Sequence, residues 1–359
     1  MSVLQRRKVY ALGVYIQHIL QNLGTPELRN QWAIAIFGDK VQNYQLSPQE
    51  QALWAADQYW AKLGLADVRG PQGHTWKGYW IPFQDQVHHV KDSQGQDQAQ
   101  KVDISKIKVG QGCDLVVVCA HGGLFCDGWP LQCLDFMKQV MKQAQEKHNL
   151  RIGFLSLDYS LSPEKPYPHA LEESLAAYRS LIKEYGVDPK RVVFAGESAG
   201  GNITLALALK VRDEFKGELD LPLGIYTICP YLFISEPYIP TLFDVLTLEL
   251  AEACIDSYSQ SRLEVIESPY FSPLNTQTFA GLPPMLLFYG GIEILRPSME
   301  QFVERLKEDG VAHQVMMKEG RGHAWFLIDP ISTPEDRKEG IEWTSRFLAE
   351  IYVNHHGRT

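Results

Sequence analysis

The sequence has no run of about 20 apolar residues, so no segment is long enough to span a membrane as a helix. Its 34 Lys and Arg residues are outnumbered by 43 Asp and Glu, and a net charge of -9 argues against a nucleic-acid-binding surface. The six cysteines form no CxxC pair and show no metal-ligand spacing. No phosphate loop, dinucleotide fingerprint or solenoid repeat is present. We therefore expect no cofactor, no metal and no nucleic-acid partner.

The N-terminal stretch carries a basic pair followed by the short apolar run 9–16, without a small-residue cleavage site after it. We interpret it as an amphipathic helix of a cap or core, with a peripheral membrane contact as the alternative. Without a secretory signal the cysteines are expected to be reduced and the protein cytoplasmic. The composition, 45% hydrophobic and 21% charged, is typical of a globular protein, here a monomer or a homodimer.

From about residue 75 onward, short apolar runs alternate with amphipathic helical segments. Continuous apolar strands separated by helices predict an α/β fold with a mostly parallel sheet covered by helices on both faces. We expect one domain over residues 1–359, with strands at 75–83, 114–123, 151–160, 191–198, 224–232, 284–291 and 313–320. Two regions break the alternation and are candidates for a helical cap over the carboxyl edge of the sheet: residues 1–70, expected to be helical before any strand, and an insertion at 232–267.

The strongest local signal is "FAGESAGGN", which places Ser198 between Gly196 and Gly200. The motif follows a predicted strand and precedes a predicted helix. A G-x-S-x-G turn of this kind holds a serine in a strained conformation with its hydroxyl exposed, and the helix N-terminus favours a developing negative charge. Ser198 is therefore the candidate nucleophile.

A second signal is "CAHGGLF" directly after the apolar run "DLVVV". Backbone N–H groups of Gly122 and Gly123 at this place would face the reacting carbonyl, and Ala199, next to the nucleophile, would supply a third. These three residues are the candidate oxyanion hole.

A histidine that serves as the base must come late in the chain. His323, in "EGRGHAWF", follows a predicted strand in a glycine-containing loop. His313 lies in or beside that strand, and the last two histidines belong to a polar tail. Glu293, in "YGGIEILRPS", follows the strand before it and is the candidate acid.

The order Ser198, Glu293, His323 resembles that of α/β-hydrolases. "HGG", "LDYSLSPEKPYPHALEE", "VDPKRVVFAGESAGGN", "SPYFSPLN" and "GLPPMLLFYGG" are similar, in the same order, to the hormone-sensitive-lipase-like esterases (alpha/beta hydrolase fold-3). The resemblance spans about residues 75–350. It implies an α/β-hydrolase fold with a helical cap, a Ser-acid-His triad, the oxyanion hole above and, as substrates, carboxylic esters with small to medium, apolar acyl or acetyl groups.

The sequence departs from the family pattern at three places. The usual third glycine after the histidine is Leu124, which would narrow or reshape the pocket. Glu197 stands where Asp is commoner, and Glu293 stands where the family places an Asp, with Pro297 in place of a further Asp one turn on. Ser-His-Glu triads occur, so we expect Glu293 to serve. The residues expected to line the substrate pocket are Leu124, Trp129, Tyr231 and Phe326.

Three other functions stay open at this point. The same triad could transfer the acyl group to another acceptor, in transacylation, lactonisation, or release and cyclisation of a natural-product intermediate. It could hydrolyse amides or formamides. A non-catalytic ligand-binding receptor is the third alternative, which the presence of His323 disfavours because the gibberellin receptors of this family lack the catalytic histidine.

Overall fold

The computed structural model describes residues 66–69, 76–83, 89–91, 97–99, 109–232, 244, 246, 248–328 and 332–357. The chain divides into two compact units, residues 1–63 and 64–359. The first unit lies outside the described residues, so the cap expected from the N-terminal region stays a prediction. All described elements belong to the second unit.

The second unit is built on an eight-stranded sheet with the order β1-β2-β6-β5-β7-β8-β9-β10. β6, β5, β7, β8, β9 and β10 run parallel to one another, and β1 and β2 add an antiparallel edge. The predicted mostly parallel sheet is confirmed, and each of the seven predicted strands is present. The strands are β1 (Ala66–Arg69), β2 (Lys77–Ile81), β5 (Leu115–Ala120), β6 (Ile152–Leu157), β7 (Val192–Glu197), β8 (Gly224–Ile228), β9 (Met285–Gly290) and β10 (His313–Lys318).

Three short strands, β1, β3 and β4, precede the parallel strands in the chain. β1 falls within residues 1–70, where the sequence suggested helix only; it pairs with β2, and this pairing outweighs local preference. β3 (His89–Lys91) and β4 (Asp97–Ala99) form a separate antiparallel pair.

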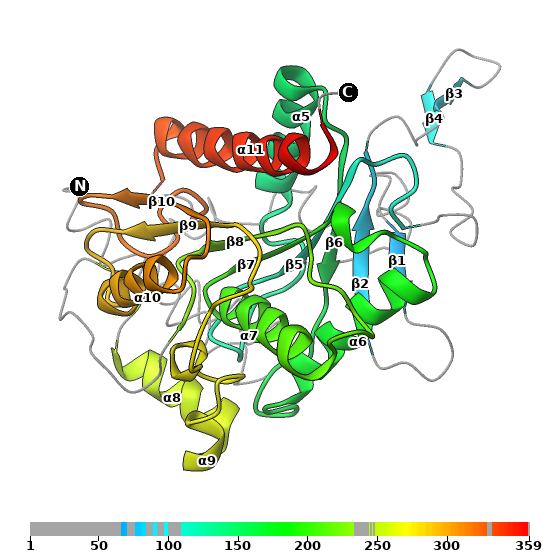
Figure 1. The fold of residues 1–359 in the computed structure, drawn as a ribbon. Coiled ribbons are helices and arrows are strands. Elements are labelled where there is room, and N and C mark those ends of the chain that lie inside the picture. The colour runs from blue at the N-terminus through cyan, green and yellow to red at the C-terminus, as the bar shows by residue number, and fades with distance from the viewer. Residues whose placement is uncertain are drawn as a thin grey trace, which may run out of the picture. The chain divides into compact units, whose positions relative to one another are not determined.

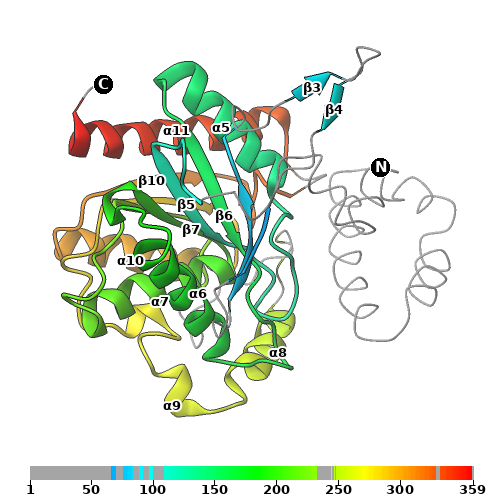
Figure 2. The same cartoon turned by 90° about the vertical axis from the view of Figure 1, so that its right-hand side faces the viewer.

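Helices cover both faces of the sheet (Figures 1 and 2). α5 and α11 lie together on one face, and α6, α7 and α10 lie on the other. Their bounds are α5 (Leu134–His148), α6 (His169–Lys183), α7 (Ala199–Glu214), α10 (Arg296–Glu308) and α11 (Pro334–His356), with short 3-10 turns at Pro189–Arg191 and Pro273–Asn275. Every residue of β6 and β9 is buried, as expected for strands covered on both faces.

Parallel strands bring their carboxyl ends to one edge of the sheet. The loops after β5, β7, β8, β9 and β10 therefore meet there, and these loops carry all of the predicted catalytic residues.

The described part of the insertion is helical, with α8 (Leu248–Ser259) and α9 (Leu263–Ile266). Tyr258 of α8 stacks on Phe125 in the loop after β5, with ring centroids 4.1 Å apart. The backbone N–H of Tyr167 donates to the carbonyl of Tyr258 at 2.9 Å. The insertion therefore packs against loops at the carboxyl edge.

Candidate active site

Ser198 occupies the sharp turn between β7 and α7. Its φ of 54° and ψ of -118° lie in a region that residues with a Cβ rarely adopt. The flanking glycines allow this turn, because a Cβ at Gly196 would lie 2.2 Å from the carbonyl oxygen of Gly200, and one at Gly200 would lie 2.1 Å from that of Ala120. The N–H of Ser198 donates to the carbonyl of Ile228 at 2.9 Å, which ties the turn to β8. The structure thus forms the strained turn that the motif predicts.

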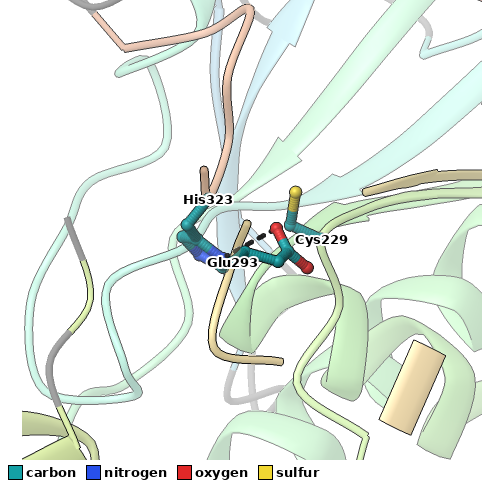
Figure 3. Close-up of side chains that lie close together, drawn as sticks. All are labelled: Cys229, Glu293 and His323. Carbon is teal, nitrogen blue, oxygen red and sulfur yellow. Dashed lines mark ion pairs between the residues drawn. The ribbon is translucent and has the colours of Figure 1, made fainter. Parts of the chain in front are cut away.

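The predicted acid and base lie beside each other (Figure 3). Glu293 follows β9 and His323 follows the adjacent strand β10. His323 Nδ1 is 3.7 Å from Glu293 Oε2, and the two side chains are 7% and 0% exposed. The N–H of Gly290 also donates to Oε2, at 3.3 Å. His323 Nδ1 and Glu293 Oε1 have no hydrogen-bond partner among the described residues, so a small side-chain movement can convert the ion pair into a hydrogen bond.

The charges around His323 decide its protonation. Burial disfavours the imidazolium and would lower its pKa, but Glu293 by hydrogen bonding and charge, and Asp244 and Glu197 by charge, outweigh burial and raise the pKa to about 9. A positive charge that forms on His323 during a reaction is therefore stabilised by its surroundings.

Two contacts bring the His323 loop to the nucleophile turn. Nε2 of His323 is 3.9 Å from Oε1 of Glu197, the residue before Ser198. The N–H of Ala324 donates to Sγ of Cys229 at 3.2 Å, and Cys229 directly follows β8, the strand to which the serine turn is bonded. Nδ1 faces the acid, and Nε2 lies on the side of the nucleophile turn.

Cys229, Glu293 and His323 place a thiol, a carboxylate and an imidazole nitrogen within 4.8 Å of one another (Figure 3). These are donor types that zinc accepts. Burial, and then the charge of Glu293, raise the pKa of the Cys229 thiol well above its usual value. This keeps the thiol protonated, whereas a metal binds the thiolate. The Glu293 carboxylate lies where it can orient the His323 ring and stabilise its positive charge.

The loop after β5 holds two of the three expected oxyanion donors. The carboxylate of Glu197 lies beside the backbone of Gly122 and accepts a hydrogen bond from Gln132 Nε2 at 3.2 Å. A Cβ at Gly122 would lie 2.0 Å from Glu197 Oε2, so the carboxylate sits directly against this backbone. The oxyanion role of Gly122, Gly123 and Ala199 stays a prediction.

His121 holds the loop after β5 in place through a ring contact and hydrogen bonds. Its ring stacks on Tyr159 with centroids 4.2 Å apart, and Nδ1 lies 2.8 Å from the carbonyl oxygen of Gly122. Tyr159 donates its hydroxyl hydrogen to the carbonyl of His121 at 2.5 Å. Burial lowers the pKa of His121 to about 4, so the ring stays neutral and its role is to hold the loop.

The four residues expected to line the pocket lie in different surroundings. Trp129 is 38% exposed and Leu124 is almost buried, with a left-handed φ of 54°. Tyr231 is fully buried, edge-on to Phe125. Phe326 corrects the sequence-based expectation: its ring packs with Phe136, Phe288, Trp325 and Gly340 in the core beneath α5 and α11.

Three residues close to His323 were not predicted from the sequence as part of the candidate site: Asp244, Glu197 and Cys229. Asp244, in the insertion, accepts hydrogen bonds from the backbone N–H groups of His323 and Ile294, both at 2.8 Å. No motif surrounds Asp244 in the sequence. Glu197 was noted only as a family departure, and Cys229 only as a reduced cysteine, although its place after a strand at the carboxyl edge could have marked it.

The comparisons with known proteins agree with this geometry. The model of the alpha/beta hydrolase fold family matches residues 117–327, more than half of the chain. The chain belongs to this family. An esterase from Acinetobacter venetianus is 27% identical over 62% of this chain and 73% of its own length. The carboxylic ester hydrolase LipN of Mycobacterium tuberculosis is 30% identical over 56% of this chain and 55% of its own length.

Solved structures show the same fold. An esterase from the bacterial hormone-sensitive lipase family superposes with a TM-score of 0.62 at 24% identity, over 82% of this chain and 90% of that one. A hormone-sensitive lipase from a metagenome library gives a TM-score of 0.59 at 25% identity, over 67% and 77% of the two chains. The predicted fold and the resemblance to hormone-sensitive-lipase-like esterases are confirmed, and with them an enzyme of the esterase type. Within the described residues, no helix is long and apolar enough to cross a membrane.

Proposed function

We propose that this hydrolase cleaves carboxylic esters with small to medium, apolar acyl or acetyl groups, using Ser198, His323 and Glu293 as its triad. The observation that supports this best is the buried His323–Glu293 pair at the same edge of the sheet as a serine held in a strained turn. Its relatives named as esterase and carboxylic ester hydrolase support the reaction class.

In the first half of the reaction, Ser198 Oγ attacks the ester carbonyl carbon while His323 Nε2 takes the hydroxyl proton. Nε2 is suited to this because Nδ1 faces Glu293. The imidazolium then protonates the leaving alcohol oxygen as the C–O bond breaks, which leaves an acyl group on Ser198.

In the second half, water attacks the acyl carbon and gives its proton to Nε2. The same nitrogen returns the proton to Ser198 Oγ as the acid departs, so the enzyme is regenerated. Glu293 stays ionised throughout and holds the imidazole in the orientation that leaves Nε2 toward the nucleophile.

The oxyanion of both tetrahedral intermediates needs fixed N–H donors. Ala199 begins α7, where the helix dipole adds partial positive charge, and Gly123 lies on the facing loop. The Glu197 carboxylate lies against the backbone of Gly122. We therefore propose Gly123 and Ala199 as the donors, with Gly122 held by Glu197 as part of the loop's structure.

An aromatic cluster supports an apolar substrate. Phe125, in the loop that carries the oxyanion donors, stacks on Tyr258 at 4.1 Å and on Phe271 at 6.5 Å between ring centroids. Tyr167 meets both Tyr258 and Phe271 edge-on. We propose that an acyl chain, rather than a charged group, binds beside this buried cluster.

The test is hydrolysis of p-nitrophenyl esters from acetyl to long acyl chains by purified full-length protein. We expect turnover that is highest for short and medium chains, and a loss of roughly 1,000-fold or more in Ser198→Ala. The products are identified with and without an added alcohol. Free acid as the main product supports hydrolysis, whereas an ester of the added alcohol as the main product would replace it with acyl transfer. Equal activity in Ser198→Ala would overturn the proposal.

A further inference from the structure

Asp244 lies in the insertion between β8 and β9, and its side chain reaches the centre of the site. The residue is 8% exposed. Oδ1 accepts the N–H of His323 and Oδ2 accepts the N–H of Ile294, each at 2.8 Å. Each carboxylate oxygen thus holds one of the two loops that carry the base and the acid.

These bonds fall next to the reacting side chains. One is made by the backbone of His323 itself, and the other by Ile294, which directly follows Glu293. Elsewhere the two loops are joined by a bond from Ile292 N–H to the carbonyl of Arg321 at 3.0 Å. That bond lies before both catalytic residues in the chain. The Asp244 carboxylate joins the two loops again at His323 itself and at the residue after Glu293.

The close approach is built into the backbone. A Cβ at Gly322 would lie 2.9 Å from Asp244 Oδ1, so a glycine there makes room for the carboxylate. Hydrogen bonds from N–H groups to a buried carboxylate are short and strong. Burial, and then the charge of Glu293, raise the pKa of Asp244 above its ordinary value, and the charge of His323 and the two N–H donors oppose this rise.

We propose that Asp244 is a positioning residue, which fixes the distance between Glu293 and His323 and couples the insertion to the rate of catalysis. The proposal rests on the triad function above. A displacement of about 1 Å in such a pair can reduce turnover by roughly 100-fold, so a clamp between the two loops has direct kinetic consequences. Asp244 contacts the backbone of His323, so the imidazole remains oriented by Glu293.

The charge of Asp244 adds a second consequence. The groups that face His323 are Glu293 after β9, Glu197 at the end of β7, Cys229 after β8 and Asp244 from the insertion. Removing one negative charge from this set makes the imidazolium less stable. The acid limb of the pH–rate profile should therefore move to lower pH in a variant without the Asp244 charge.

The decisive variant is Asp244→Asn, which keeps the size of the side chain but offers one oxygen acceptor in place of two. We expect kcat to fall by roughly 10- to 100-fold with KM almost unchanged, and the acid limb to move down. The matched control is Asp256→Asn, an exposed aspartate on α8 of the same insertion, which should leave kcat, KM and the pH profile unchanged.

Three outcomes decide the proposal. An unchanged kcat in folded Asp244→Asn, or a rise in KM alone, would reduce Asp244 to an anchor of the insertion and overturn it. Loss of activity in Asp244→Asn with full activity in Glu293→Gln would make Asp244 the triad acid, which also overturns it. A failure of the proposed triad is distinguished from a failure of this proposal by Ser198→Ala, which would then keep wild-type activity. Circular dichroism and thermal melting establish that each variant is folded.

Discussion

His323 Nδ1 lies 3.7 Å from Glu293 Oε2, and the Glu293 side chain is completely buried. A buried carboxylate is costly unless it is paired, and the imidazole is the cationic partner that this one has. The side chain of Glu, longer than the Asp that the family pattern has here, therefore lies beside the imidazole as a paired, buried carboxylate.

Replacing Glu293 tests this pairing. In Glu293→Gln the orienting charge is lost while the size is kept, so we expect the protein to fold and kcat to fall by roughly 100- to 10,000-fold. Glu293→Asp keeps the charge but shortens the side chain, so its activity should lie between wild type and Gln. Steady-state kinetics on one short-chain ester measure all three, and wild-type turnover in Glu293→Gln would contradict the assignment.

The pH dependence follows from the pKa of about 9 at His323. The neutral imidazole is the base, and the fraction of it falls as pH decreases through this pKa. Hence kcat/KM should rise with pH through the neutral range and level off on the alkaline side, above the pH expected for an ordinary histidine. An acid limb centred near pH 6.5 would show that the neighbouring carboxylates do not act on His323 as described.

The charge of Glu197 should also affect the acid limb of the pH–rate profile. Glu197 lies on the Nε2 side of the His323 ring, whereas Glu293 lies on the Nδ1 side. The Glu197 carboxylate is 3.9 Å from His323 Nε2, so Glu197→Gln removes a charge at the same volume. We expect the acid limb to shift to lower pH, because the imidazolium loses one stabilising charge. Gln132→Ala is the control, since it removes a hydrogen bond to the same carboxylate without changing the charge. The idea fails if both variants titrate like wild type.

Thiol reactivity should single out one of the six free cysteines. The neighbouring Cys254 side chain lowers the pKa of Cys126, and Cys126 is only partly buried; its Sγ donates to the backbone carbonyl of Cys254 at 3.6 Å. Burial raises the pKa of Cys113, Cys119, Cys133 and Cys229, and the bond with Cys126 raises that of Cys254. Brief iodoacetamide treatment followed by peptide mass mapping should therefore modify Cys126 first. Cys126→Ser should remove this fast phase; first modification at Cys229 would contradict the burial described.

The sequence predicted the parts of the site that have local signals. Ser198 was predictable because the turn needs glycines at fixed spacing, and His323 because it follows a strand late in the chain. Glu293 followed from strand order alone. Asp244 could not be predicted, because its bonds join residues 50 and 79 positions away through an insertion without a motif.

Two further features have no local signal in the sequence. Side-chain packing brings the Glu197 carboxylate against the backbone of Gly122, and a motif does not encode such packing. Phe326 was expected in the pocket because it is close to His323 in the chain. Three residues after the histidine, however, the chain has already turned into the core, where Phe288 and Gly340 contact the ring.

The most direct test of the central claim is reaction of the full-length protein with a fluorophosphonate, measured by intact mass and peptide mapping. The account predicts a single adduct on Ser198, absent in Ser198→Ala and formed much more slowly in His323→Ala, because the serine then lacks its base. An unlabelled wild-type protein, or an adduct on another residue, would contradict it.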